Sequence, residues 1–213
     1  MRPALRTWSS RRETLVLAAG LLLPRGLAAA QLPPTPRQTE GPFYPVELPS
    51  DLDDDLVRVT GLDAMAMGQV THVLGRVLDR QGRPLPGTLV EIWQCDANGR
   101  YHHPGDRGRT PDPAFQGYGR TLTDTGGGYR FRTIRPVAYP GRTPHIHFKV
   151  RTPDGAALTT QMYVRGEPLN ERDGLLAGVR DPAARERLLV SLAPAPDLEA
   201  GALAGTFEIV LDV

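Results

Sequence analysis

Two histidines, His145 and His147, are separated by a single residue in the 213-residue chain. On a β-strand this spacing directs both imidazole rings to one face, with Cα atoms roughly 6.5 Å apart, while Ile146, Phe148 and Val150 point to the other face. Two imidazoles on one face can bind a metal ion through their ring nitrogens. Two ordinary, half-exposed strand residues would have the same spacing, so the pair alone leaves both interpretations open.

Two tyrosines beside turns extend this candidate metal site. Tyr101 begins a polar segment, residues 101–106, and Tyr139 is followed directly by Pro140 and Gly141. Proline and glycine favour turns, so we expect local backbone geometry to fix the direction of both phenols. A phenol ionises near pH ~10, and it therefore binds a metal at neutral pH only where the metal displaces its proton.

The donor set of Tyr101, Tyr139, His145 and His147 favours ferric iron. Two phenolates and one bound hydroxide would supply three negative charges, which balance Fe(III) in a pocket where uncompensated charge is costly. Zinc with the same donors would leave a net negative site. Ferrous oxygenases usually combine two histidines with one carboxylate, and no Asp or Glu follows His147 closely. Cys95 is the only cysteine, which excludes thiolate zinc sites and an internal disulfide.

The first 30 residues have the features of an export signal. Paired arginines, Arg11 and Arg12, precede an apolar run at residues 15–23, and Ala28–Ala30 form a small-residue cleavage pattern. The run ends at Pro24 and is shorter than the ~20 residues that a membrane span needs. We therefore expect a twin-arginine signal that is cleaved after residue 30 and a periplasmic or secreted mature protein. Retention of the segment as an anchor is the alternative.

Loss of residues 1–30 would change the charge of the protein. The segment holds five of the 25 basic residues and one of the 24 acidic residues, so the remainder carries a net charge of about −3 instead of +1. No basic stripe indicates a nucleic-acid partner, and no further apolar segment would hold the mature chain in a membrane. The sequence therefore favours a small-molecule substrate.

The remaining chain indicates one all-β domain. We expect residues 31–68 to form an N-terminal arm and loops, and residues 69–213 to form an antiparallel or mixed β-sandwich of about seven or more short strands with long ordered loops. Residues 125–128 predict a hairpin, and residues 182–192 predict one short helix with Asp181 as its N-cap. The predicted strands are 70–78, 88–95, 119–124, 129–133, 145–151, 158–164 and 206–213.

Several motifs in a fixed order resemble the intradiol ring-cleavage dioxygenases, most closely the protocatechuate 3,4-dioxygenase branch. The resemblance runs from about Thr39 to Val213. It implies a β-sandwich that binds non-haem Fe(III) through the four donors named above, and an enzyme that uses O2 to cleave a catechol-type ring between its two hydroxyl-bearing carbons. The product would be a muconate-type diacid that contains both oxygen atoms. The motifs are Val90–Gln94, Asn98–His102, Tyr118–Asp124, Tyr129–Pro136, Tyr139–Pro140, Arg142–His147 and Gln161–Tyr163.

The resemblance also implies roles beyond metal binding. Tyr139 matches a tyrosine that leaves the iron when substrate binds, so that its oxygen can take up a catechol proton. Arg142 matches an arginine that stabilises carbanion character in the bound ring; a solvated loop arginine is the alternative. Gln161 matches a substrate-pocket glutamine, although an ordinary polar strand residue is nearly as compatible. Gly141 stands where a tryptophan is usual, which implies a more open pocket, and Trp93 is expected in the core.

Two other functions remain compatible with the sequence. Residues 77–90 also resemble the strand–turn–strand unit of prealbumin-like carbohydrate-binding and adhesive domains, so a non-catalytic binding module is one alternative. A zinc hydrolase on the same scaffold is the other. The ring substituent of the substrate stays open, as does the choice between a monomer, a homo-oligomer and a hetero-oligomer. Convergence of the four donors on one position would favour the iron enzyme.

Overall fold

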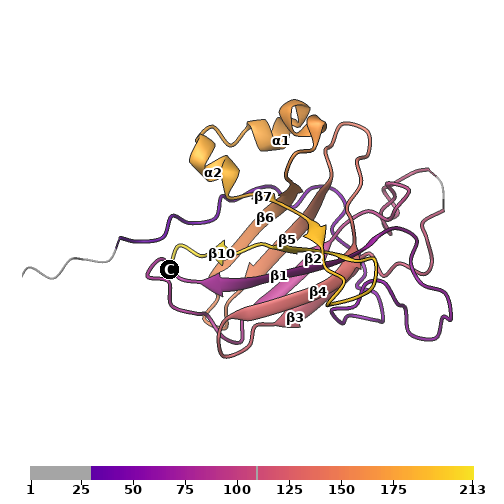
Figure 1. Cartoon of the computed structure of the whole chain (residues 1–213), viewed down its shortest axis with the longest axis horizontal. Coiled ribbons are helices and arrows are strands. Elements are labelled where there is room, and N and C mark those ends of the chain that lie inside the picture. Colours follow the sequence, from indigo (N-terminus) through magenta and orange to yellow (C-terminus); the bar gives the residue numbers. More distant parts are fainter. Residues whose placement is uncertain (1–29, 109) are drawn as a thin grey trace, which may run out of the picture.

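Two stacked β-sheets form the body of the computed structural model, which describes residues 30–108 and 110–213 (Figure 1). The predicted all-β sandwich is confirmed, whereas the predicted export signal lies outside the described residues. The first sheet contains β1 (Val70–Leu78), β4 (Gly128–Ile134), β8 (Ala193–Pro194), β9 (Leu203–Thr206) and β10 (Ile209–Val210). The second contains β2 (Leu89–Trp93), β3 (Tyr118–Leu122), β5 (His145–Arg151), β6 (Ala157–Val164) and β7 (Leu189–Val190).

Both sheets are mixed, which is one of the two arrangements that the sequence predicts. In the first sheet, β1 pairs antiparallel with β4 and parallel with β9 and β10. In the second sheet, β2, β3, β5 and β6 pair antiparallel, and the short β7 runs parallel to β6. Among the described residues, no helix has the length and apolar character that would be needed to cross a membrane.

The predicted hairpin at residues 125–128 is wrong. The strand before it, β3, pairs with β2, and the strand after it, β4, pairs with β1, so this segment connects the two sheets. The turn itself forms: the Asp124 carboxylate accepts hydrogen bonds from the amides of Gly126 and Gly128, and Gly127 has φ +75°. Turn chemistry specifies where the chain reverses, but it does not specify which strand receives the backbone hydrogen bonds.

The helical content also differs from the prediction of a single helix at residues 182–192. Helix α2 spans only Pro182–Glu186, although Asp181 caps it as expected through the amides of Ala183 and Ala184. The chain then forms β7 against β6, because Leu188 and Val190 are buried in the core between the sheets. A 3-10 helix, η1 (Pro168–Arg172), and a short helix, α1 (Gly174–Ala177), precede α2 and were not predicted.

The C-terminal segment is divided, whereas the sequence predicts one strand at residues 206–213. Two short strands, β9 and β10, lie one after the other along β1. Phe207 and Leu211 also donate backbone hydrogen bonds to β1, so the segment follows β1 with only a local break. Alternation of buried Phe207, Ile209 and Leu211 agrees with the predicted inward face.

The core between the sheets determines which face of β5 is free for chemistry. Ile146, Phe148 and Val150 are fully buried in it, together with Phe131 of β4. Because side chains alternate along a strand, the other face of β5, with His145 and His147, lies on the outside of the second sheet. The burial of both histidines must therefore come from the loops and the N-terminal arm.

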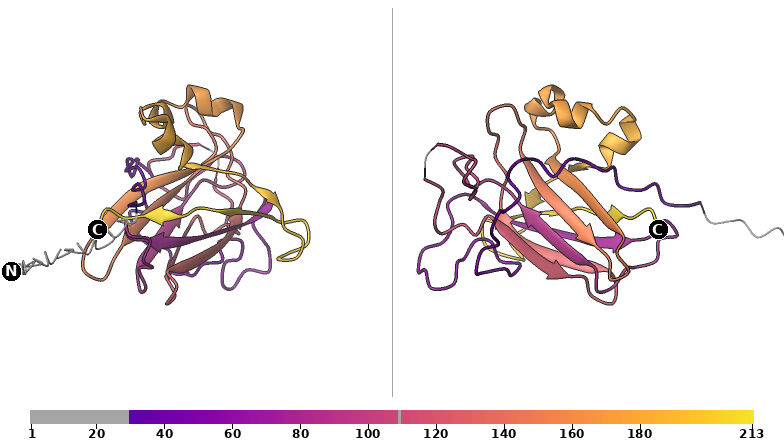
Figure 2. Two further views of the ribbon diagram at one scale, coloured as in Figure 1. Left: turned by 60° about the vertical axis from the view of Figure 1, so that its left-hand side comes forward. Right: turned by 180° about the vertical axis from the view of Figure 1, so that it is seen from behind.

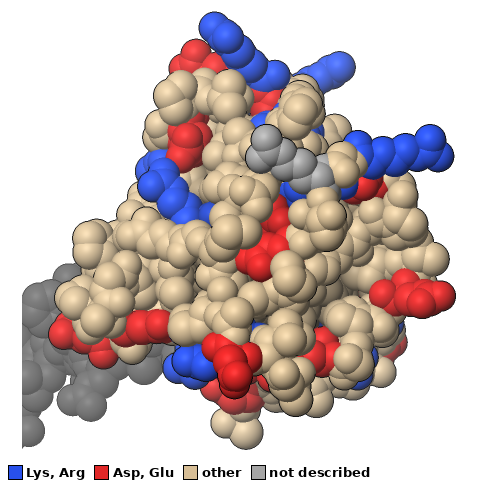
Figure 3. Space-filling view, turned by 90° about the vertical axis from the view of Figure 1, so that its right-hand side faces the viewer, with Lys and Arg blue, Asp and Glu red and all other residues tan. Residues whose placement is uncertain are grey.

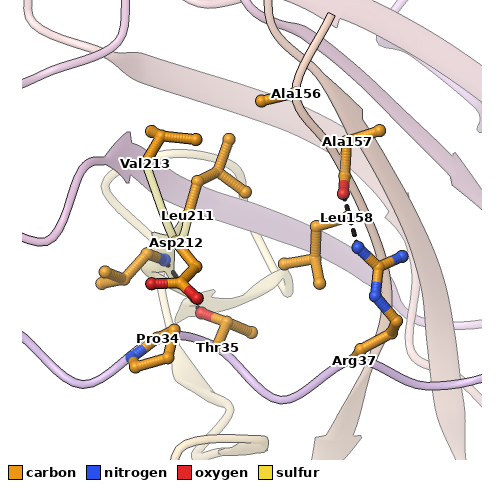
Figure 4. A pocket seen from close by; sticks show the side chains of 10 residues that line it. Pro34, Thr35, Arg37, Ala156, Ala157, Leu158, Leu211, Asp212 and Val213 are labelled. Carbon is orange, nitrogen blue, oxygen red and sulfur yellow. Dashed lines mark hydrogen bonds between the residues drawn. The ribbon is translucent and has the colours of Figure 1, made fainter.

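The N-terminal arm joins the two sheets along one side. The amide of Thr35 donates to the carbonyl of Val210 in β10, and the amide of Gln38 donates to the carbonyl of Thr159 in β6. Arg37 donates to the carbonyl of Ala157, beside a cleft of about 460 Å³ that none of the predicted site residues lines (Figure 4). Farther along, the arm crosses over the outer face of the second sheet (Figure 2).

Candidate metal centre

The four predicted donors, Tyr101, Tyr139, His145 and His147, surround one space. The ring centroids of the two histidines lie 4.8 Å apart, and those of Tyr101 and Tyr139 lie 5.6 Å apart. Tyr139 is 5.5 Å from His145, and Tyr101 is 6.2 Å from His147, which closes the circle. Residues from a strand and two separate loops thus meet at one position.

The two histidine Nε2 atoms face each other; a hydrogen bond fixes the tautomer of His145, whereas Nδ1 of His147 has no hydrogen-bond partner among the described residues. Nδ1 of His145 lies 2.6 Å from the carbonyl oxygen of Thr143, so Nδ1 carries the proton and Nε2 keeps a free lone pair. Nε2 of His145 is 3.2 Å from Nε2 of His147. Two nitrogens that each lie about 2.0–2.1 Å from one ion are separated by at most about 4.2 Å, so this pair can share a metal ion.

A tight turn places Tyr139 next to Arg142. The amide of Arg142 donates to the carbonyl of Tyr139, with Pro140 second in the turn and Gly141 third. Gly141 has φ +84°, which a residue with a side chain rarely adopts, and this residue order is that of a type II turn. A Cβ atom at Gly141 would meet no atom within 4 Å, so the site is open on this side.

Tyr101 is fixed by the loop that follows β2. The Asp96 carboxylate accepts hydrogen bonds from the amides of Asn98 and Arg100, and the amide of Tyr101 donates to Asp106. The ring of Phe43, from the N-terminal arm, stacks on Tyr101 with centroids 4.7 Å apart. The phenol is 2 % exposed, and its hydroxyl has no well-aligned hydrogen-bond partner among the described residues. A buried hydroxyl without a partner is costly, and a bound metal ion would satisfy it.

Burial controls the protonation of all four donors. It lowers the pKa of His145 to about 4 and the pKa of His147 well below its ordinary value, with the nearby Arg142 charge acting in the same direction. Both imidazoles are therefore neutral and able to bind a metal. Burial raises the pKa of Tyr101 well above its ordinary value and also raises that of Tyr139. Only a strong cation would ionise these phenols at neutral pH.

The donors brought together here are phenols and imidazoles. Among the described residues, no group of three or more His, Cys, Asp or Glu side chains is placed to hold a metal ion. The residues present fit an ion that binds phenolate oxygen and imidazole nitrogen, because the two Nε2 atoms lie together and the phenols of Tyr101 and Tyr139 lie beside them.

Arg142 lies at the edge of this centre and is held on two sides. Its Nε donates to the carboxylate of Asp173 at 2.8 Å, and its Nη2 donates to the side-chain oxygen of Gln161 at 2.5 Å. The guanidinium also contacts Tyr139 and lowers the pKa of that phenol, against the larger effect of burial. Tyr139, Arg142 and Asp173 line a cavity of about 130 Å³. The alternative of a solvated Arg142 is therefore wrong.

Gln161 is buried behind Arg142. It lies opposite His147 in the pairing of β5 and β6, and it is 0 % exposed. Besides accepting from Arg142, it accepts from the hydroxyl of Tyr163, and its amide nitrogen donates to the carbonyl of Thr39. Both polar atoms of the Gln161 side chain therefore already have protein partners. Its contact with substrate stays a prediction.

Three residues near the centre carry roles that the sequence did not reveal. Trp93 is buried, as predicted, but its ring also stacks on His147 with centroids 4.7 Å and planes 9° apart. Gly41 crosses His147 so closely that a Cβ atom there would lie 3.3 Å from the imidazole Cε1. Asp173 anchors Arg142. The pairing register of β2 and β5 could have indicated the contact between Trp93 and His147, since these two residues lie opposite each other in the sheet.

The face of the molecule seen in Figure 3 has acidic and basic side chains interspersed. This distribution differs from the continuous basic area that is typical of a nucleic-acid-binding surface.

Comparison with known proteins shows the family. Residues 39–213 match the protein family described as dioxygenase. The chain is 42% identical to the protocatechuate 3,4-dioxygenase beta chain of Burkholderia cepacia, covering 82% of this chain and 78% of that protein. It is 31% identical to the hydroxyquinol 1,2-dioxygenase of Corynebacterium glutamicum over 66% of this chain, but over only 50% of that protein.

Solved structures agree with this result. The dioxygenase domain of a dioxygenase carbohydrate-binding protein fusion from Streptomyces sp. SirexAA-E has a TM-score of 0.66 at 36% identity, covering 85% of this chain and 99% of that one. Catechol 1,2-dioxygenase from Acinetobacter sp. ADP1 has a TM-score of 0.63 at 29% identity, covering 84% and 62%. The chain belongs to the intradiol ring-cleavage dioxygenase family and is a ring-cleaving dioxygenase, an oxidoreductase.

Proposed function

We propose that this protein binds non-haem Fe(III) through Tyr101, Tyr139, His145 and His147 and cleaves a catechol-type substrate between its two hydroxyl-bearing carbons with O2. The product is a muconate-type diacid that contains both oxygen atoms. The observation that carries the proposal is the closed circle of the four rings, with the Nε2 atoms of the two histidines 3.2 Å apart. When bound, ferric iron would draw electron density from a coordinated diphenol and make its ring reactive toward O2.

The two tyrosines are held differently, which supports different roles. Tyr101 is enclosed by the β2 loop and stacked under Phe43, so it serves as a permanent ligand. Tyr139 projects from a turn beside a cavity, and its partner across that turn is Arg142. It can therefore move away when a diphenol enters, and its phenolate oxygen can accept a proton from the substrate hydroxyl. The positive charge of Arg142 stabilises negative charge that develops on the bound ring.

The site also argues against both alternative functions. A non-catalytic β-sandwich module has no need to bury two imidazoles and two phenols around one space, since each buried polar group without a partner costs stability. A zinc hydrolase would require two ionised phenols, and the burial of Tyr101 and Tyr139 opposes their ionisation by a divalent ion. A trivalent ion exerts a stronger electrostatic field on the two phenols and therefore favours their ionisation more than a divalent ion does.

The test of the proposal combines metal analysis with colour and product. The purified protein is expected to contain about one iron per chain and to be red from phenolate-to-iron charge transfer, whereas zinc would give a colourless protein. Anaerobic titration with a set of diphenols should shift the charge-transfer band, and reaction under ¹⁸O2 should place both labelled atoms in the diacid. A colourless, iron-free protein with full activity would refute the proposal.

A matched pair of tyrosine variants locates the ligand. Tyr101→Phe should abolish iron binding and colour. Tyr118→Phe is the control, because Tyr118 is equally buried and packs in the same cluster as Tyr101, but its hydroxyl donates to Glu91. Equal iron content in the two variants would exclude Tyr101 as a ligand.

We further propose that residues 1–30 direct export by the twin-arginine route and are then removed, so that the enzyme works in the periplasm or outside the cell. The paired Arg11 and Arg12 support this proposal. Replacement of both by lysine should leave the protein in the cytoplasm, as cell fractionation would show. Export of this variant at the normal level would contradict the route.

A further inference from the structure

Asp173 is a buried carboxylate next to the proposed centre. Its side chain is 0 % exposed, and it makes four hydrogen bonds with both of its oxygens. Oδ2 accepts from Nε of Arg142 at 2.8 Å and from the amide of Thr143 at 3.0 Å. Oδ1 accepts from the amides of Leu175 and Leu176, both at 3.0 Å, and so caps helix α1. A single side chain therefore connects the helix, the Arg142 loop and the guanidinium.

Two acceptors fix the plane of the Arg142 guanidinium. Asp173 accepts from Nε and Gln161 accepts from Nη2, so the planar group cannot turn about its Cδ–Nε bond without breaking one of these hydrogen bonds. The loop is held a second time, because the hydroxyl of Thr143 donates to Asn170 at 2.8 Å. Nη2 also donates to the hydroxyl of Tyr163 at 3.4 Å, and the guanidinium contacts Tyr139 at the cavity.

We propose that Asp173 is a positioning residue, which holds Arg142 in the orientation that faces Tyr139 and the cavity beside it. This inference rests on the proposed function of the site. A planar guanidinium can stabilise charge on the bound ring only in one orientation. Misplacement of such a group by about 1 Å can lower a rate by about 100-fold. The alternative role for Asp173 is limited to capping α1.

Helix α2 supplies a matched control for that alternative. Asp181 caps α2 through the amides of Ala183 and Ala184 but forms no contact with Arg142. Serine is as good an N-cap as aspartate, and its short side chain cannot also reach Nε of Arg142. Asp173→Ser therefore removes the contacts with Arg142 and with the amide of Thr143 but keeps a cap, and Asp181→Ser makes the same replacement at an exposed N-cap that holds neither group.

The experiment measures kinetics, colour and structure for both serine variants of the iron-loaded protein. Asp173→Ser should keep the iron and the red colour and lose between about 10- and 100-fold in kcat, with a smaller change in KM. Asp181→Ser should match the wild type. Asp173→Ser should add less than about twofold to the loss caused by Arg142→Ala, because both changes remove the same interaction. If Asp173→Ser does not fold, Asp173→Asn takes its place, since the asparagine side chain keeps one oxygen that can accept hydrogen bonds.

Crystal structures of the variants separate this inference from the proposed function. A displaced Arg142 side chain in Asp173→Ser, with an unchanged one in Asp181→Ser, supports the positioning role even if the wild type cleaves no diphenol. An Arg142 side chain that stays in place in Asp173→Ser overturns the inference. A kcat equal to that of Asp181→Ser, in an active enzyme, overturns it as well.

Discussion

Substitution of Gly41 by alanine tests whether the N-terminal arm shapes the metal centre. Gly41 has φ +75°, so any side chain there costs roughly 1–2 kcal/mol of backbone strain. The new Cβ atom would also lie 3.3 Å from Cε1 of His147, closer than the ~3.5–4.0 Å at which carbon atoms attract. His147 or the arm must therefore move by a few tenths of an ångström. Displacing a ligand in this way should weaken iron binding by about 10- to 100-fold.

Gly61→Ala is the control for this prediction. Gly61 has φ +89°, but a Cβ atom there would meet nothing within 4 Å, so the variant has the backbone strain without the contact. Both variants should lose about 2–8 °C in Tm from this strain, since 1 kcal/mol corresponds to about 2–4 °C for a domain of this size. Only Gly41→Ala should lose iron during dialysis against a chelator, measured as iron per chain and as charge-transfer absorbance. If the two variants retain the same iron, the close approach of Gly41 to His147 is irrelevant to metal binding.

Three further predictions concern the site and the charges outside it. His147→Ala should lose both iron and activity, as iron analysis would show, and retention of full iron content would exclude this ligand. Arg142→Ala should keep the iron and the red colour but lower kcat, and normal turnover would remove Arg142 from the mechanism. Hydrogen bonds from Arg132 lower the pKa of Glu199 to about 2, so the stability from this pair is complete above about pH 4.3 and is lost as the pH falls toward 2. The free energy of urea unfolding of Glu199→Gln should therefore lie about 1 kcal/mol below that of the wild type at pH 6 and equal it near pH 2, whereas a constant difference would contradict this linkage.

The alternating pattern of β5 made the main features of the site predictable. With Ile146, Phe148 and Val150 on one face, the two histidines had to share the other, and a Pro-Gly turn had to follow Tyr139. Both expectations depend on residues near each other in the chain. The meeting of Tyr101 with the histidines depends on two loops and a sheet, so the residue types suggested it as a hypothesis and the family resemblance then implied it.

Other features depend on contacts that the sequence does not encode locally. The turn at residues 125–128 was predicted, but the sheets that its strands join were not, because pairing is decided by the whole core. Asp173 gave no signal, since an aspartate before a short apolar segment is also an ordinary helix cap. Its second role requires Arg142, which is 31 residues away in the chain, to lie beside it.

The position of the centre on the outer face of the second sheet gives the N-terminal arm a functional importance. The opposite sheet cannot cover this face, so the protection of the donors from water must come from loops and from the arm. Gly41 lies against His147, Phe43 stacks on Tyr101, and the carbonyl of Thr39 accepts from Gln161. The burial that keeps both imidazoles neutral is therefore supplied in part by residues 39–43, where the match to the dioxygenase family also begins. The arm is thus better regarded as one wall of the metal centre than as a linker to the sandwich.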